Sequence, residues 1–211
     1  KELPQVVMSK FFNNGDFRSG YYRDQTFMMA IDQLDSNQFF AQLYAHTDIN
    51  FDPHSGGRQM NCHFGTRMLN DQGDWKTLTD IKNSASDISP VSGQMPRIVG
   101  LGYASKLFRN NKNLSDMHNF SINGNEVIFG TIGDASTSEG HFWESINACG
   151  VLQIPVVMSI WDNGYGISVP SEYHTTRNDL SKVLSGFQRS SKKENGFCLL
   201  YTSDAADESR G

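Results

Sequence analysis

The fold is decided by the stretch VIFGTIGDASTSEG at residues 127–140, where an apolar run ends in small residues and a carboxylate. Val127–Ile132 is β-branched and aromatic with hardly any polar side chain, which is typical of a strand covered on both faces. Ser136 and Glu139 have the spacing of a capping box, which predicts that a helix over 137–151 begins here. The stretch therefore predicts a strand that leads through a tight turn into a helix.

A second apolar run follows that helix. Val156–Trp161 has the composition of another covered strand, and it ends in the polar segment Asp162–Gly166. A helix is also expected over 93–109, with Pro96 in its first turn. Because strands and helices alternate, we expect an α/β domain with a mainly parallel sheet and flanking helices.

The rest of the chain is less regular. Asp24–Ala45 has the apolar spacing of two short helices, the second capped by Ser36. Residues 48–74 are rich in Gly, Asn and His without a period, and such long loops are usually functional or disordered. Asn123-Gly124 predicts a tight turn, and beyond Pro170 the sequence is polar and weakly patterned.

Composition excludes several classes of protein. Acidic residues outnumber basic residues by 23 to 18, so the sequence has no basic footprint for nucleic acid. No apolar run reaches the length of a membrane span. Cys62, Cys149 and Cys198 show neither a paired framework nor metal-ligand spacing. We therefore expect a cytoplasmic protein with reduced thiols and with no nucleic acid or membrane as its partner.

The two ends indicate an incomplete domain. Residue 1 is a lysine, and segments of functional character begin soon after it. The run from Cys198 to Glu208 resembles a translated sequencing-library adapter. We expect a domain over 1–197 that is truncated at both ends, and a non-native tail over 198–211 that makes no dense core contacts.

Two polar residues stand where a ligand is expected. In an open parallel sheet, ligands bind outside the carboxyl ends of the strands. Asp134 follows the first predicted strand and Asn163 the second, so one strand–helix–strand unit presents both at the same edge. Each motif alone is often only a turn, but the pairing is more specific. A carboxylate and an amide oxygen suit Mg²⁺ that also binds phosphate, so we expect a diphosphate held through magnesium.

Four segments, in order along the chain, resemble one enzyme family. Gly133–Ser168 is similar to the thiamine-diphosphate signature, a Gly-Asp-Gly turn followed at a fixed distance by Asn-Asn. Gly57–Gly65, Ser89–Pro96 and Tyr21–Gln25 resemble further segments of the α component of 2-oxo acid dehydrogenases. The likeness extends over 21–170, and is greatest to branched-chain enzymes and to chains that fuse α and β.

The resemblance implies thiamine diphosphate and Mg²⁺ as cofactors in a thiamine-diphosphate-binding fold. The metal ligands implied are the side chains of Asp134 and Asn163 and the carbonyl oxygen of Tyr165. Tyr22 and Arg23 would bind the diphosphate, since a guanidinium matches phosphate in a forked geometry. The implied cofactor contacts are Tyr22, Arg23, Ser89, Val91, Gly133, Asp134, Ala135, Ser136, Asn163 and Tyr165.

Two further roles follow from the same resemblance. Backbone groups of Ser89 and Val91 would contact the aminopyrimidine ring. His63 would be catalytic, stabilising charge or moving a proton near the thiazolium carbon. The other five histidines are expected to be ordinary hydrogen-bonded or surface residues, and they are His46, His54, His118, His141 and His174.

The sequence also departs from the family pattern. Ala135 replaces the third residue of Gly-Asp-Gly, which requires a negative φ there. Asp162 replaces the first Asn of the pair. Trp161 stands where some relatives have a diphosphate-binding Arg.

The activity implied is oxidative decarboxylation of a 2-oxo acid, with a branched-chain acid such as 3-methyl-2-oxobutanoate preferred. The acyl group would pass to the lipoyl domain of an E2 acyltransferase. An activating Glu would come from a β subunit or a β half of the same chain, in an α2β2 assembly or a fused homodimer. The isolated fragment is therefore expected to be inactive.

Other functions stay open. The substrate alternatives are those of pyruvate and acetoin dehydrogenase α subunits. A transketolase-like enzyme or a decarboxylase is a second alternative, against which the Gly57–Gly65 segment argues. A non-catalytic nucleotide-binding module is a third, because a fold does not determine function.

Overall fold

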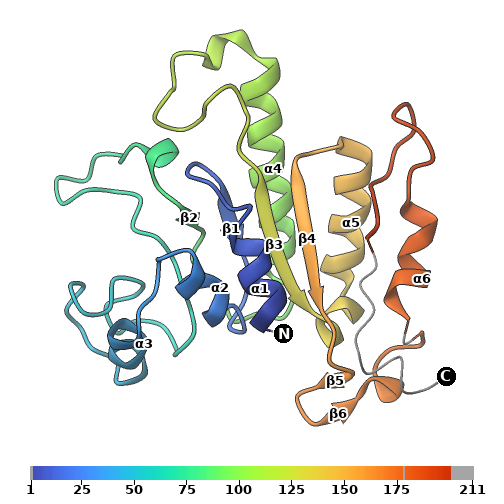
Figure 1. Cartoon of the computed structure of the whole chain (residues 1–211), viewed down its shortest axis with the longest axis horizontal. Coiled ribbons are helices and arrows are strands. Elements are labelled where there is room, and N and C mark those ends of the chain that lie inside the picture. Colours follow the sequence, from blue (N-terminus) through green and yellow to red (C-terminus); the bar gives the residue numbers. More distant parts are fainter. Residues whose placement is uncertain (1, 178, 201–211) are drawn as a thin grey trace.

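The protein is a three-layer α/β domain built on a parallel sheet (Figure 1). The computed structural model describes residues 2–177 and 179–200. The sheet has the order β2-β1-β3-β4, and every neighbouring pair is parallel. Its strands are β1 (Phe17–Ser19), β2 (Asn83–Ser84), β3 (Ile128–Gly133) and β4 (Val156–Trp161). The expected α/β class is confirmed.

Helices cover both faces of this sheet. The α4 helix (Gln94–Asn110) and α5 (Gly140–Leu152) pack against one face, whereas α1 (Glu2–Ser9) and α2 (Gln25–Ala30) pack against the other. The α3 helix (Ser36–Leu43) lies to one side (Figure 1). The hairpin β5 (Tyr165–Gly166) and β6 (Val169–Pro170) precedes α6 (Leu180–Leu184). Single 3-10 turns are η1 (Leu78–Asp80), η2 (Lys112–Leu114), η3 (Ala135–Ser138), η4 (Ser171–Tyr173) and η5 (Ser185–Phe187). None of the described helices has the length and apolar character needed to cross a bilayer.

The central strand β3 has the two covered faces that its composition predicts. Ile128 and Ile132 belong to the core cluster beneath α4 and α5. Phe129 points the other way, into the cluster formed with α1 and α2. Successive side chains of a strand alternate between faces, so a nearly continuous apolar run fills both cores. The predicted bounds of β3 differ from those observed by one residue, and those of β4 agree.

Two helix starts differ from the sequence-based expectation. The cap of α3 is Asp35, not Ser36, and Asp35 forms a capping box with Gln38. The capping box expected from Ser136 and Glu139 is absent: the N-cap of η3 is Asp134 and that of α5 is Glu139, and neither makes a side-chain cap hydrogen bond. Instead the backbone N–H and the hydroxyl of Thr137 both donate to the carbonyl of Asp134, which tightens the turn into η3. The α5 helix therefore begins only at Gly140. The turn at Asn123-Gly124 is confirmed by positive φ at both residues, but it does not join two strands.

A fully buried ion network joins β1 to its neighbours. The Arg18 guanidinium donates to Asp24 Oδ2 at 2.8 Å and to Asp87 Oδ2 at 3.0 Å. It also donates to the hydroxyl of Ser84 and the carbonyl of Tyr21. Burial alone would lower the pKa of Arg18, but Asp87 and Asp24 hold it above its ordinary value. The guanidinium therefore stays charged inside the domain, and each of its three nitrogens donates a hydrogen bond.

The segment expected to be a non-native tail is described only as far as Leu200. Leu199 packs against the core cluster beneath α4 and α5, so this residue does contribute to the core. Leu200 is 85% exposed, and residues 198–200 form neither helix nor strand. The origin of the tail stays a prediction, and residues 201–211 lie outside the described part of the chain.

The ion network predicts a large effect of removing its cation. Arg18→Met should destabilise the domain by about 3–5 kcal/mol, because two buried carboxylates lose their partner. Arg67→Met is the matched control, since Arg67 pairs with Asp71 at the surface and exposed pairs contribute about 0–1 kcal/mol. Urea unfolding of both variants measures the difference. Equal and small effects would show that the network is not essential to stability.

Candidate functional site

The site lies at the carboxyl ends of the parallel strands, where the chain changes direction across the sheet. β1 lies between β2 and β3. The chain runs from β1 to β2 on one side, but from β3 to β4 on the other. Loops that follow two such strands separate and leave a crevice, which is the usual ligand site of an open α/β sheet. Here these are the loops 20–24 and 134–139.

Asp134 begins the turn after β3 and is only 5% exposed. Its Oδ2 atom is buried and has no hydrogen-bond partner among the described residues. A buried carboxylate oxygen without a donor is costly unless a cation or proton compensates it. The position therefore fits a metal ligand, and a hard oxygen of this kind suits Mg²⁺.

Asn163 reaches the same edge from β4. The register pairs Gly133 with Trp161, so the segments that follow the two strands start side by side, as expected. The Asn163 side chain is exposed, and its Oδ1 accepts the Tyr165 N–H at 3.4 Å. A carbonyl oxygen has two lone pairs, so this bond leaves room for a second partner.

The described residues contain no cluster of three or more His, Cys, Asp and Glu that would hold a metal without other ligands. The predicted metal ligands are of another kind: the carboxylate of Asp134, the amide of Asn163 and the backbone carbonyl of Tyr165. Magnesium at such a site takes its remaining ligands from phosphate and water. The shared ion itself stays a prediction.

The loop after β1 passes very close to the ion network. A Cβ built on Gly20 would lie 1.9 Å from Asp24 Oδ2, so only glycine fits there. The next residue, Tyr21, has a buried hydroxyl with no partner among the described residues. A Cβ built on Gly133 would lie 3.4 Å from that hydroxyl. Tyr21 therefore lies against the strand tip that carries Asp134.

Tyr22 and Arg23, the pair expected to bind diphosphate, lie beside Tyr21, and the ring centroids of Tyr21 and Tyr22 are 5.2 Å apart. Tyr22 is about half exposed, and Arg23 Nη2 donates to its hydroxyl at 3.1 Å. The guanidinium also stacks on the Tyr22 ring, 5.3 Å from the centroid. Within the described ranges Arg23 has no carboxylate partner, so its charge is available to an anion.

His63 and Ser89, far apart in sequence, are hydrogen-bonded to each other. His63 Nε2 lies 3.0 Å from Ser89 Oγ, and Nδ1 lies 3.2 Å from the Asn61 carbonyl. Because a carbonyl only accepts, Nδ1 carries the proton of the neutral ring and Nε2 accepts from Ser89. Asp87 accepts the Phe64 N–H at 3.0 Å, so the ion network also holds the loop of His63.

The segment 89–93 is tied to the turn after β3. Val91 is exposed, as a ligand-contacting residue requires. Ser92 has a positive φ of 59°, and its hydroxyl donates to the Ser136 carbonyl at 2.5 Å. Non-glycine residues in this region carry strain, which tends to occur at functional sites.

The departures from the family pattern have structural reasons. Ala135 is not among the described residues of positive φ, so its methyl group is tolerated. Trp161 is buried in the core cluster on the α1 side, and its indole N–H donates to Asp24 Oδ1 at 3.4 Å. The residue that replaces a diphosphate-binding Arg therefore stabilises the ion network instead. Asp162 Oδ1 accepts the Gly164 N–H, which shapes the turn.

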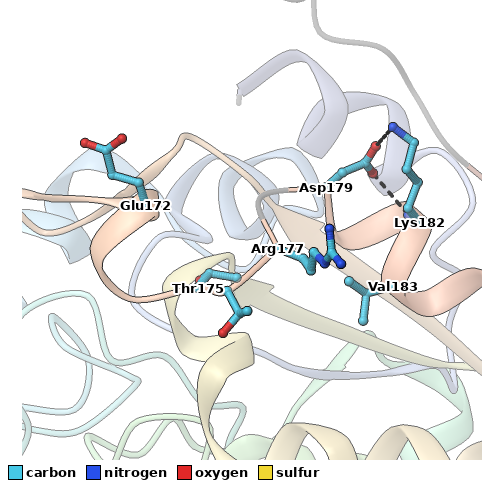
Figure 2. A pocket seen from close by; sticks show the side chains of 7 residues that line it. Glu172, Thr175, Arg177, Asp179, Lys182 and Val183 are labelled. Atoms are coloured by element: carbon cyan, nitrogen blue, oxygen red, sulfur yellow. Dashed lines mark hydrogen bonds and ion pairs between the residues drawn. The ribbon is translucent and has the colours of Figure 1, made fainter.

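An open pocket of about 660 Å³ lies on the segment after the β5–β6 hairpin (Figure 2). Its lining includes Glu172, Thr175 and Arg177, and at the start of α6 Asp179 pairs with Lys182 at 2.8 Å (Figure 2). None of the residues expected to bind the cofactor lines this pocket. The candidate site is instead defined by the unpartnered atoms at the strand tips.

Sequence reasoning missed three residues at this edge. Tyr21 precedes the expected pair and carries the buried hydroxyl. Ser92 lies within a resembling segment, and only its φ and its contact distinguish it. His174 was expected to be an ordinary histidine, yet its Nε2 is buried and unpartnered within the described chain. No local pattern marks His174, because Ala135 and Ser138, which lie near it, belong to η3 and are distant in sequence.

The fold and the site define a class: an α/β domain with a ligand-binding edge at its switch point. A family model described as "Dehydrogenase E1 component" matches residues 1–196. The chain belongs to the dehydrogenase E1 component family.

The curated relatives are α subunits. The "2-oxoisovalerate dehydrogenase subunit alpha" of Bacillus subtilis (strain 168) is 27% identical over 195 residues, which are 92% of this chain and 50% of the relative. The mitochondrial protein of that name from Homo sapiens is 25% identical over 210 residues, 100% of this chain and 40% of the relative. The Arabidopsis thaliana "subunit alpha 1, mitochondrial" is 33% identical over 112 residues, 53% of this chain and 18% of the relative. The chain thus spans half or less of the length of these relatives.

The hydrogen bond that joins segment 89–93 to the turn after β3 can be tested by substituting Ser92. Ser92→Ala removes the hydrogen bond and keeps the strained φ, whereas Ser92→Gly removes both. We expect Ser92→Ala to lower the unfolding free energy by about 0.5–1.5 kcal/mol, because a part-buried hydrogen bond to the Ser136 carbonyl is lost. Ser92→Gly should lower the unfolding free energy by less than Ser92→Ala, since glycine adopts this φ without strain. Urea unfolding compares the two, and a larger loss for glycine would contradict the assignment of strain.

Proposed function

We propose that the protein is the α-type portion of a 2-oxo acid dehydrogenase E1 component, acting on a branched-chain 2-oxo acid. Family membership and the α-subunit relatives support the class of reaction. The names of those relatives support the branched-chain substrate. The single observation that carries the cofactor role is Asp134 Oδ2, a buried oxygen without a partner at the switch point.

This chain would supply the magnesium and diphosphate half of the site. Asp134, Asn163 and the Tyr165 carbonyl would hold Mg²⁺, and Tyr22 with Arg23 would hold the diphosphate of thiamine diphosphate. When bound, the cofactor supplies the electron sink that decarboxylation requires. The protein contributes orientation and charge. The remaining contacts proposed are Ser89, Val91, Gly133, Ala135 and Ser136.

His63 is proposed to move a proton near the reacting carbon. Its Nδ1–H is held by the Asn61 carbonyl, which leaves Nε2 as the atom that gains or loses the proton. Ser89 donates to that atom. A substrate group that displaces the Ser89 hydroxyl would meet a ring already oriented. General acid–base groups need such orientation before they act.

The partners are proposals of the same kind. A β subunit or a β half would supply the activating Glu, and a lipoyl domain of E2 would accept the acyl group. The assembly proposed is α2β2 or a fused homodimer. The cytoplasmic location expected from the sequence likewise stays a prediction.

The cofactor role is tested by Asp134→Asn, an isosteric change. In the complete protein with its partner half, we expect binding of thiamine diphosphate with Mg²⁺ to weaken by 100-fold or more by titration calorimetry, an order-of-magnitude expectation for a lost ion ligand. Asp116→Asn, on the surface loop before β3, is the control and should bind normally.

A second measurement separates function from folding. Without cofactor, Asp134→Asn should melt at the same temperature as the unmodified protein or higher, because the substitution removes an uncompensated buried charge. Unchanged cofactor affinity would overturn the proposed metal site.

The chain alone should not turn over substrate. We expect no decarboxylation of 3-methyl-2-oxobutanoate by the isolated 211-residue chain, because half of the site is missing. Addition of the β partner to the complete α portion should restore it. Turnover by the isolated chain, measured as release of CO₂, would contradict a divided site.

A further inference from the structure

His174 is placed at the strand tips by the β5–β6 hairpin. A Cβ built on Gly166 would lie 3.5 Å from His174 Nε2 and 2.9 Å from the Ala135 methyl carbon. The imidazole and Ala135 therefore lie together against the backbone of β5. Ser138 Oγ donates to the His174 carbonyl at 3.0 Å, which ties the segment to η3. The histidine is thus held against the residue that follows Asp134.

The hydrogen bonds around this ring allow two tautomers. Thr175 Oγ1 lies 2.7 Å from His174 Nδ1 and 3.3 Å from Ser138 Oγ. Ser138 already donates its proton to the His174 carbonyl, so Thr175 donates either to Nδ1 or to Ser138. In the first arrangement the neutral ring carries its proton on Nε2, and in the second on Nδ1. In both, Nε2 is buried without a partner among the described residues.

Three unpartnered polar atoms surround consecutive backbone positions. The Tyr21 hydroxyl lies beside Gly133, Asp134 supplies Oδ2, and His174 Nε2 is on the Ala135 side. With the proton on His174 Nε2, two of these groups are donors and one is an acceptor, yet no hydrogen bond joins them. Buried polar groups are nearly always satisfied. A ligand with both a cation and anionic oxygens would satisfy all three.

We propose that His174 is a diphosphate-binding residue that donates from Nε2–H to a phosphate oxygen of the cofactor. This inference rests on the proposed function, which supplies the diphosphate and its Mg²⁺. The alternative is that Nε2 is a bare metal ligand, which would require Thr175 to donate to Ser138 across the longer contact. Mg²⁺ prefers oxygen ligands to an imidazole nitrogen, which favours the anion as the partner of Nε2.

The test compares two substitutions of similar size in the complete protein with its partner half. His174→Phe keeps a flat ring without a donor, and His174→Gln keeps an N–H donor. At saturating Mg²⁺, His174→Phe should weaken binding of thiamine diphosphate and of inorganic pyrophosphate by about 10- to 100-fold, as expected for a hydrogen bond to a charged group. His174→Gln should stay within a few-fold of the unmodified protein. His118→Ala, an exposed histidine on the loop before β3, is the control.

Each outcome decides the assignment. Normal binding by His174→Phe, or equal losses in the Phe and Gln variants, overturns it. A loss that is present at low Mg²⁺ and absent at saturating Mg²⁺ identifies a metal ligand instead and also overturns the assignment. If Asp134→Asn loses binding and His174→Phe does not, the proposed function stands and only this inference fails. If the unmodified protein binds neither thiamine diphosphate nor inorganic pyrophosphate, the proposed function itself fails.

Discussion

The domain depends on one buried guanidinium. Arg18 lies in the middle of the sheet, on β1, and its donors reach Asp24, Asp87, Ser84 and the Tyr21 carbonyl. A charge at this depth is tolerated only when it is paired and its hydrogen bonds are complete. The same network holds the loops after β1 and β2 and, through Phe64, the loop of His63. Structural stability and the arrangement of the candidate site therefore have a common origin.

The carboxylates of this network are satisfied to different degrees. Asp24 accepts from Arg18, from the Thr131 hydroxyl and from the indole of Trp161. Burial raises the pKa of Asp24 although Arg18 and Thr131 oppose that change. Asp87 keeps one oxygen without a partner among the described residues. Trp161 thus has a clear role: from β4, it donates to the remaining oxygen of Asp24.

The candidate site is preorganised, but several of its buried polar atoms have no hydrogen-bond partner among the described residues. Asp134 Oδ2, the Tyr21 hydroxyl and His174 Nε2 are buried at the tip of β3 without partners in the described chain. Their positions are held by packing and by short bonds such as that from Ser92 to the Ser136 carbonyl. A scaffold that fixes unsatisfied groups has already met the ordering cost of binding. That arrangement is what a site for a charged cofactor requires.

Sequence alone determined the central part of the fold and its two most informative residues. The strands β3 and β4 are apolar on both faces, so their composition and spacing predict them, and parallel pairing then brings Asp134 and the 162–166 segment to one edge. The short strands β1 and β2 carry buried polar residues, Arg18, Ser19, Asn83 and Ser84, so no hydrophobic pattern marks them. Only the tertiary structure decided that their loops meet the β3 turn, and that His63 meets Ser89 and His174 meets Ala135. The physical reason is that these contacts join residues distant in sequence through a buried ion network and strand pairing, whereas a local pattern reports only what neighbouring residues do.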